Sequence, residues 1–173
     1  MENKMFCYQC QETANCSGCT VSGVCGKKPE VAAMQDLLVY ATKGLSAVAQ
    51  QLRAEGKEVS QELNHRVTMN LFITITNANF DNDAIVENIK ETFAMRDAVR
   101  ATLSDSSKLP KAATVEVAEK DYPVFAQSIG VLATENEDIR SLRELITYGL
   151  KGLAAYSKHA NALLKDDANV DAF

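Results

Sequence analysis

The chain has 173 residues, of which 46% are hydrophobic and 24% charged, and its formal net charge is −5 at pH 7. This composition is ordinary for a globular protein, and the negative charge argues against a protein that binds nucleic acid through non-specific attraction. No apolar run approaches the ~20 residues of a membrane-spanning helix, and no secretory signal precedes the first cysteine, so we expect a cytoplasmic protein with no membrane partner.

The cysteines of the chain are confined to one short N-terminal segment. There are five, and they are Cys7, Cys10, Cys16, Cys19 and Cys25. An odd number of cysteines in a chain without an export signal argues against a disulfide framework. Such a concentration is typical of a site that needs several soft ligands. Gly18, Gly23 and Gly26 allow tight turns and leave backbone N–H groups free to point at sulfur, which tunes iron–sulfur clusters.

Three interpretations of this loop remain open from the residues alone: an iron–sulfur cluster, a zinc site, and unliganded or redox-active thiols. The pairs Cys7-x2-Cys10 and Cys16-x2-Cys19 resemble zinc knuckles. They are closer together than in the usual zinc ribbons, however, and Cys25 would then have no role. Lys27 and Lys28 follow closely, and positive charge there would favour the more reduced, more negative state of a cluster.

The first helix is predicted between Pro29, which suits a first helical position, and Gly56, which suits a C-terminal stop. Its apolar residues recur at alternating spacings of three and four and so share one face. They are Val31, Met34, Leu38, Ala41, Leu45, Val48 and Leu52.

Two more helices are expected before residue 104. The second begins near Ser60 and carries Leu63, Val67, Leu71 and Ile75. Its β-branched run 71–76 would also suit a strand, but the length and the upstream spacing favour a helix, which the turn-forming residues 77–81 should end. The third has Asp81 or Asp83 as its N-cap. Its inward positions are Ile85, Ile89, Phe93, Val99 and Leu103.

The second half of the chain is predicted to be helical after a connection. Residues 104–120 indicate a connecting segment that carries at most a short frayed helix. Residues 121–130 predict a short helix with Pro123 near its start. A long helix should follow, capped by Asn136 or Asp138 and running to about Lys165. Its three-four stripe consists of Ile139, Leu142, Ile146, Gly149, Leu153, Tyr156, Ala160 and Leu163.

An internal repeat links the two long helices. The pattern Leu37-x-x-Tyr-x-x-Lys-Gly-Leu-x-Ala47 recurs 108 positions later as Leu145-x-x-Tyr-x-x-Lys-Gly-Leu-x-Ala155. A glycine inside a helix costs roughly 1 kcal/mol relative to alanine, so a repeated one suggests a packing use. We therefore predict an all-α fold of two related helical hairpins or three-helix bundles. The expected divisions are 1–28 (cysteine loop), 29–104 (first bundle), 105–120 (linker) and 121–173 (second, incomplete helical segment).

A family resemblance adds to this interpretation and covers essentially the whole chain. The chain resembles the N-terminal part of the hybrid-cluster (prismane) proteins, a family of hydroxylamine reductases. The motifs that carry the resemblance are Met5-Phe-Cys-x-Gln-Cys-Gln-Glu-Thr13, Gly18-Cys-Thr-x-x-Gly-x-Cys-Gly-Lys27, Gln35-Asp-Leu-Leu38, Thr74-Ile-Thr-Asn-Ala-Asn-Phe80 and Tyr148-Gly-Leu-Lys-Gly-Leu-Ala-Ala-Tyr156.

The resemblance implies a [4Fe-4S] cluster on Cys7, Cys10, Cys19 and Cys25, with Cys16 as a non-ligand or an alternative ligand. Members of the family are several times longer. Their later domains hold a hybrid iron–sulfur–oxygen cluster that reduces hydroxylamine to ammonia or acts on nitric oxide. The present chain is then expected to carry an electron-entry cluster and no catalytic residue. Its partners would be a cytoplasmic electron donor and the remaining domains, and alone it could self-associate.

An alternative function is a helical interaction scaffold whose N-terminus is stapled by zinc or a cluster, without a redox role. The histidines, His65 and His159, are expected at the surface rather than as metal ligands. Asp36, Lys43 and Lys151 could pair across helices, but solvated charges are the more usual outcome.

Overall fold

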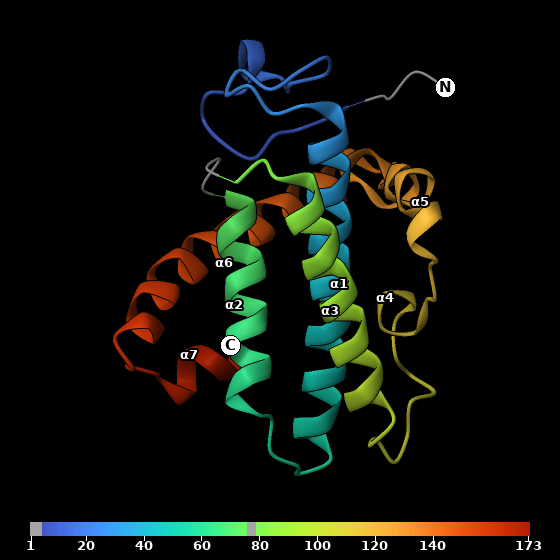
Figure 1. Cartoon of the computed structure of the whole chain (residues 1–173), viewed down its shortest axis with the longest axis vertical. Coiled ribbons are helices and arrows are strands. Elements are labelled where there is room, and N and C mark those ends of the chain that lie inside the picture. The colour runs from blue at the N-terminus through green and yellow to red at the C-terminus, as the bar shows by residue number, and fades with distance from the viewer. Residues whose placement is uncertain (1–4, 76–78) are drawn as a thin grey trace.

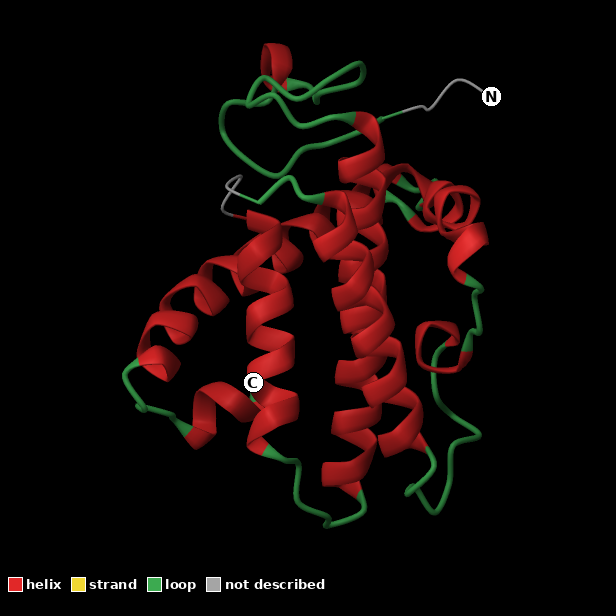
Figure 2. Ribbon diagram, in the orientation of Figure 1, coloured by secondary structure: helices red, strands yellow, loops and turns green. Residues whose placement is uncertain are grey.

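The computed structural model describes residues 5–75 and 79–173. Within those ranges it confirms the predicted all-α class, with seven α-helices, three short 3-10 helices and no named strand (Figures 1 and 2). Of the turn predicted at 77–81, residues 77 and 78 lie outside the described ranges. None of the helices in the described part is long and apolar enough to span a bilayer.

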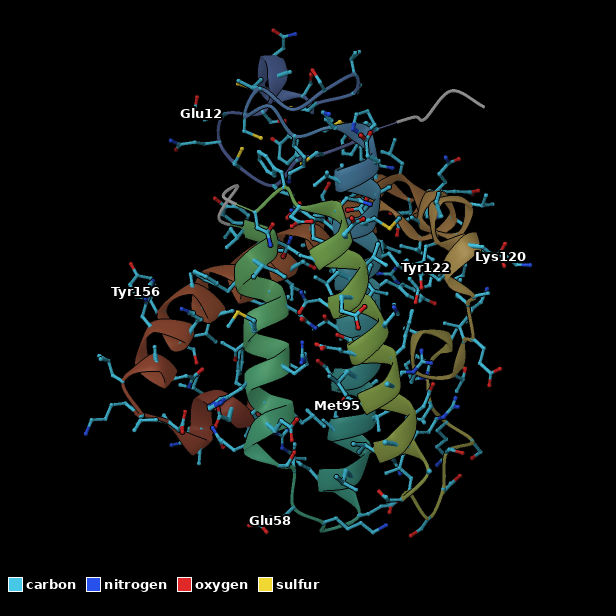
Figure 3. The ribbon with its side chains drawn as sticks, in the orientation of Figure 1. Glu12, Glu58, Met95, Lys120, Tyr122 and Tyr156 are labelled. Atoms are coloured by element: carbon cyan, nitrogen blue, oxygen red, sulfur yellow. The ribbon has the colours of Figure 1, made fainter. Side chains whose placement is uncertain are left out.

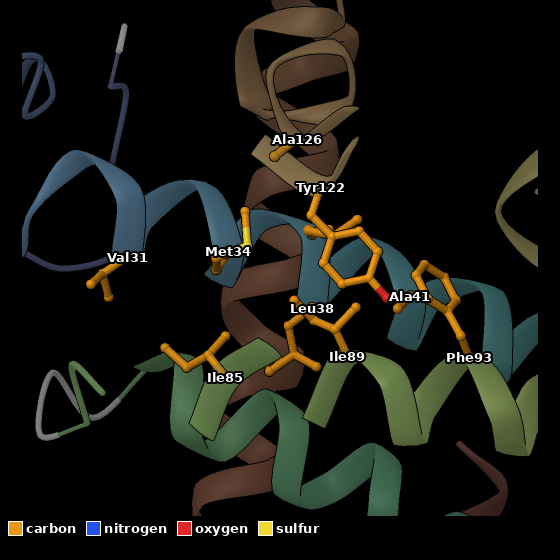
Figure 4. Close-up of a cluster of buried hydrophobic side chains, with 10 residues drawn as sticks. Val31, Met34, Leu38, Ala41, Ile85, Ile89, Phe93, Tyr122 and Ala126 are labelled. Atoms are coloured by element: carbon orange, nitrogen blue, oxygen red, sulfur yellow. The ribbon is translucent and has the colours of Figure 1, made fainter. Parts of the chain in front are cut away.

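Helix α1 (Pro29–Ala54) forms the centre of the molecule, with Pro29 at its first turn and Gly56 beyond its end at a φ of +72°. All seven residues of its predicted apolar stripe are buried. Figure 4 shows part of this stripe packed against Ile85, Ile89 and Phe93 of α3 and against Tyr122 of α5. Because α1 is buried along its length, apolar burial rather than helix propensity dominates its stability.

Helices α2 (Gln61–Ile75) and α3 (Asn82–Arg100) pack against α1. The run that would also have suited a strand is helical as far as Ile75. Asp81 caps α3, because its side chain accepts hydrogen bonds of 3.1 Å from the backbone N–H groups of Asp83 and Ala84. The predicted position Leu103 falls beyond the end of α3. Asn70 joins the three helices, since its amide donates to the hydroxyls of Thr42 and Thr92 at 3.1 and 2.8 Å.

The segment between α3 and the second long helix carries the short helices predicted within 104–120 and over 121–130. It holds α4 (Lys111–Thr114), the 3-10 turns Glu119–Asp121 and Val131–Ala133, and α5 (Tyr122–Ile129). Both α4 and α5 pack against α1. Gly44 permits the approach of α4, because a Cβ placed there would lie 2.1 Å from the carbonyl oxygen of Ala112. The glycine of the first repeat copy therefore has the predicted packing use.

Helix α6 (Glu137–Ala162) packs against α2, and the short α7 (Ala168–Ala172) follows it. Asn136 caps α6 by accepting a hydrogen bond of 3.0 Å from the N–H of Ile139. The buried residues of α6 are Thr147, Lys151 and Ala154, whereas much of its predicted apolar stripe is exposed. Figure 3 shows Tyr156 of this stripe pointing away from the helices. A Cβ at Gly152, the second repeat glycine, would meet no atom within 4 Å.

Candidate metal centre

The cysteine loop lies beyond the first turn of α1, at the upper end of the molecule in Figure 1. Its backbone brings Cys7 opposite Cys19 in an isolated antiparallel bridge, with N···O distances of 3.0 and 2.9 Å. Gly18 allows the return of the chain, because it has a φ of +127° and a Cβ there would lie 2.6 Å from the ring of Phe6. Loop geometry therefore places two of the predicted ligands as neighbours.

Cys19 is the buried cysteine of the loop, and its sulfur receives hydrogen bonds. The N–H of Ala14 donates to its Sγ at 3.4 Å, and the Thr13 hydroxyl lies 3.7 Å from the same atom. Backbone hydrogen bonds, first from Ala14 and then from Val24, lower the pKa of the Cys19 thiol. The surroundings of this sulfur thus favour the thiolate, which is the metal-binding form of cysteine.

Cys7 lies against a buried lysine. The Lys27 ammonium donates to Cys7 Sγ over 3.9 Å, and the lysine is only 1% exposed. Burial raises the pKa of the Cys7 thiol, while the charge of Lys27 acts in the opposite direction. Among the described residues no carboxylate forms an ion pair with Lys27. A buried ammonium next to sulfur fits an anionic group bound at this point, because a buried charge requires a counter-charge.

The other three cysteines are more accessible and are not assembled with the first pair. Cys10 is half-buried, Cys16 and Cys25 are exposed, and all five are free thiols. Within residues 5–75 and 79–173, no three or more His, Cys, Asp or Glu side chains gather in a metal-binding group. The four-cysteine ligand set, with Cys16 as the alternative, therefore stays a prediction.

A second buried lysine lies behind Cys7. Lys151 of α6 is 1% exposed and donates to the side-chain carbonyl of Gln9, which lies between Cys7 and Cys10. Burial lowers the pKa of Lys151 to about 8, although the negative charge of Asp36 acts in the opposite direction. Burial raises the pKa of Asp36 to about 7, although the positive charge of Lys151 acts in the opposite direction. The expectation of a solvated Lys151 is wrong, because this side chain is buried in a cavity lined by residues of the loop and of α1.

A small cavity of about 10 Å³ brings these charged groups together with the loop. Its lining consists of Cys7, Gln9, Lys27, Ala32, Gln35, Asp36 and Lys151. The sequence suggested that Asp36 could pair with Lys43 or Lys151, but it gave no signal that Lys151 is buried, because its repeat copy Lys43 is an identical residue that is exposed. Larger cavities of about 540 and 440 Å³ lie among α1, α5 and α6 and among α1, α2 and α6, and no cysteine lines either of them.

Neither histidine contacts a loop cysteine in the interactions of the described residues. His65 Nε2 pairs with Asp166 at 2.9 Å on the surface. The ring of His159 stands edge-on to Phe72 at a centroid distance of 5.7 Å. Both positions agree with the expectation that the histidines lie at the surface.

Comparison with known proteins shows a relationship along the whole described chain. The model of the Prismane/CO dehydrogenase family matches residues 5–173. A protein of Desulfovibrio desulfuricans named hydroxylamine reductase is 55% identical over 174 residues, which cover 100% of this chain and 32% of that protein. Hydroxylamine reductase from Clostridium perfringens is 50% identical over 98% of this chain and 32% of that protein. Hydroxylamine reductase 2 from Clostridium acetobutylicum is 47% identical over 98% of this chain and 34% of that protein.

The chain thus spans about a third of the length of these relatives. The family match covers the cysteine loop, all seven α-helices and both copies of the repeat. The identity with the relatives extends over the same elements rather than over the cysteine motif alone. The chain belongs to the Prismane/CO dehydrogenase family.

Proposed function

We propose that this chain is the N-terminal electron-transfer part of a hydroxylamine reductase and that its loop holds a [4Fe-4S] cluster on Cys7, Cys10, Cys19 and Cys25. The observation that carries the proposal is the 55% identity to a hydroxylamine reductase over the whole chain. The thiolate-favouring hydrogen bonds on Cys19 and the buried Lys27 ammonium against Cys7 support an anionic, thiolate-bound group.

When bound, such a cluster would accept and release single electrons. The chain's own residues supply its surroundings: Ala14 and Thr13 hold the Cys19 sulfur, and Lys27 holds the Cys7 sulfur. The donor would be a cytoplasmic electron carrier. The electrons would pass to a hybrid cluster in the remaining part of the longer protein, where hydroxylamine, two electrons and two protons give ammonia and water, or where nitric oxide is the substrate. No residue described in this chain is assigned to that reaction.

Metal analysis of the anaerobically purified chain tests the cluster. We expect iron and acid-labile sulfide near four each per chain, and a broad visible absorption that dithionite bleaches. Replacing Cys7, Cys10, Cys19 or Cys25 individually by serine should lower the iron content. Cys16→Ser is the matched control and should keep it. Zinc without a visible band would contradict the proposal, and loss of iron in Cys16→Ser would make Cys16 a ligand.

We also propose that α6 forms the contact with the remaining domains. This contact is the interaction that the alternative function, a helical scaffold, would supply. Exposed apolar residues on α6 support it: Ile139, Leu142, Leu145, Ile146, Tyr148, Leu153 and Tyr156. Extended apolar surface of this kind marks an interaction site. The isolated chain should self-associate through this surface as its concentration rises, as measured by sedimentation velocity. Leu145→Glu should reduce the association, and an unchanged sedimentation profile would exclude α6 as the contact.

A further inference from the structure

The charges behind Cys7 are unbalanced toward the positive. The lysines Lys27 and Lys151 are each 1% exposed, although lysine is among the residues least often buried. One carboxylate, Asp36, lines the small cavity that both lysines share. Among the described residues neither ammonium is within ion-pair distance of a carboxylate. Two buried cations therefore share the cavity with one carboxylate that pairs with neither, and Glu144 acts on Lys151 without pairing with it.

Both ammonium groups are directed at the turn from Cys7 to Cys10. The Lys27 ammonium lies 3.9 Å from Cys7 Sγ, and Lys151 donates to the side chain of Gln9. These lysines come from distant parts of the chain, one from the loop itself and the other from the middle of α6. The hydrogen bond of Lys151 also ties α6 to the loop. A purely structural tie would not require a charged donor, because a neutral amide can donate to Gln9 equally well.

We propose that Lys151, together with Lys27, raises the reduction potential of the cluster in the cysteine loop. This inference rests on the proposed cluster. Reduction adds one negative charge to the cluster, and a positive charge held nearby in a poorly solvated site stabilises the reduced form more than the oxidised form. Lys151 is thus a positioning residue whose charge sets how readily the loop accepts an electron, and α6 brings that charge to the loop.

Two neutral variants and two matched controls test this role. Lys151→Gln and Lys27→Gln remove a buried charge and keep a polar side chain. Lys43→Gln removes the repeat counterpart of Lys151, and Lys28→Gln removes the neighbour of Lys27; both of these lysines are exposed. The measurement is the midpoint potential of the full 173-residue chain, followed by visible absorption during an anaerobic titration. Iron and sulfide contents are determined on the same samples.

We expect a more negative midpoint potential in Lys151→Gln and in Lys27→Gln, a further negative shift in the double variant, and values close to the unmutated chain in both controls. Lys151→Arg, which keeps the charge, should restore most of the potential. An unchanged potential in Lys151→Gln with full iron and sulfide would overturn the inference. Loss of iron from both Lys151→Gln and Lys151→Arg would also overturn it, in favour of a purely structural tie. Lack of iron and sulfide in the unmutated chain would overturn the proposed cluster itself.

Discussion

Helices α1 and α6 have the same length and share a repeated pattern, but their surroundings are opposite. Each has 26 residues, and both ends of α6 lie 108 positions after the corresponding ends of α1, which is the offset of the repeat. Leu37 in α1 is 0% exposed, whereas its counterpart Leu145 in α6 is 68% exposed. The lysines are reversed, because Lys43 is exposed and Lys151 is buried. Related sequence segments therefore occupy a central and a peripheral position in one molecule.

The difference arises from the neighbours of the two helices. Helix α1 is contacted by α2, α3, α4 and α5, whereas α6 packs chiefly against α2. An amphipathic pattern states which residues share a face, but it does not state what covers that face. Burial needs a second surface, and for α6 the described chain supplies one only around Thr147, Lys151 and Ala154. The predictions below use matched positions of the repeat to test this contrast.

The largest expected effect comes from the repeated leucine. Leu37→Ala should destabilise the chain by about 2–5 kcal/mol, because it removes buried methyl groups and leaves a cavity. Leu145→Ala should change the free energy of unfolding by less than about 0.5 kcal/mol, because that side chain is exposed. Urea unfolding followed by circular dichroism measures both. Equal losses at the two positions would mean that α6 is packed as tightly as α1.

The repeated glycine should give effects of opposite sign. Gly44→Ala would place a Cβ 2.1 Å from a backbone oxygen of α4, so we expect a loss of about 1–3 kcal/mol from overpacking. Gly152→Ala meets no atom within 4 Å, so the better helix propensity of alanine should stabilise the chain by roughly 0.5–1 kcal/mol. The same unfolding measurement applies. A stabilising Gly44→Ala would show that α4 does not rest on α1.

The last prediction concerns the pH dependence of stability at the small cavity that Asp36 shares with Lys151. Burial raises the pKa of Asp36 from 3.8 to about 7 in the folded chain. Between these values the folded state binds more protons at this carboxyl than the unfolded state, so the contribution of Asp36 to stability falls as pH rises from about 4 to about 7. Asp36→Asn should remove this fall. The free energies of unfolding at pH 5 and pH 7 measure it, and an identical pH dependence in the variant would refute it.

Local sequence was sufficient for most of the secondary structure. The sequence predicted the start of α1 at Pro29 and its apolar stripe, and it narrowed each cap to two residues, of which Asp81 and Asn136 are the caps. Caps and three-four spacing are predictable because they act within a few residues of one another. The family motifs likewise indicated the family to which the chain belongs, whereas the metal-binding loop that the cysteine spacing indicates stays a prediction.

Only the tertiary structure decided which surface of each helix is covered and where the charges lie. The pairing of Cys7 with Cys19 depends on how the loop folds back, and the burial of Lys151 depends on the residues of the loop and of α1 that line the cavity around it. Leu37 and Lys43 have exposures opposite to those of their repeat counterparts Leu145 and Lys151, so no local pattern contains that information. The reason is that burial and desolvation are properties of pairs of surfaces, and the second surface comes from a distant part of the chain.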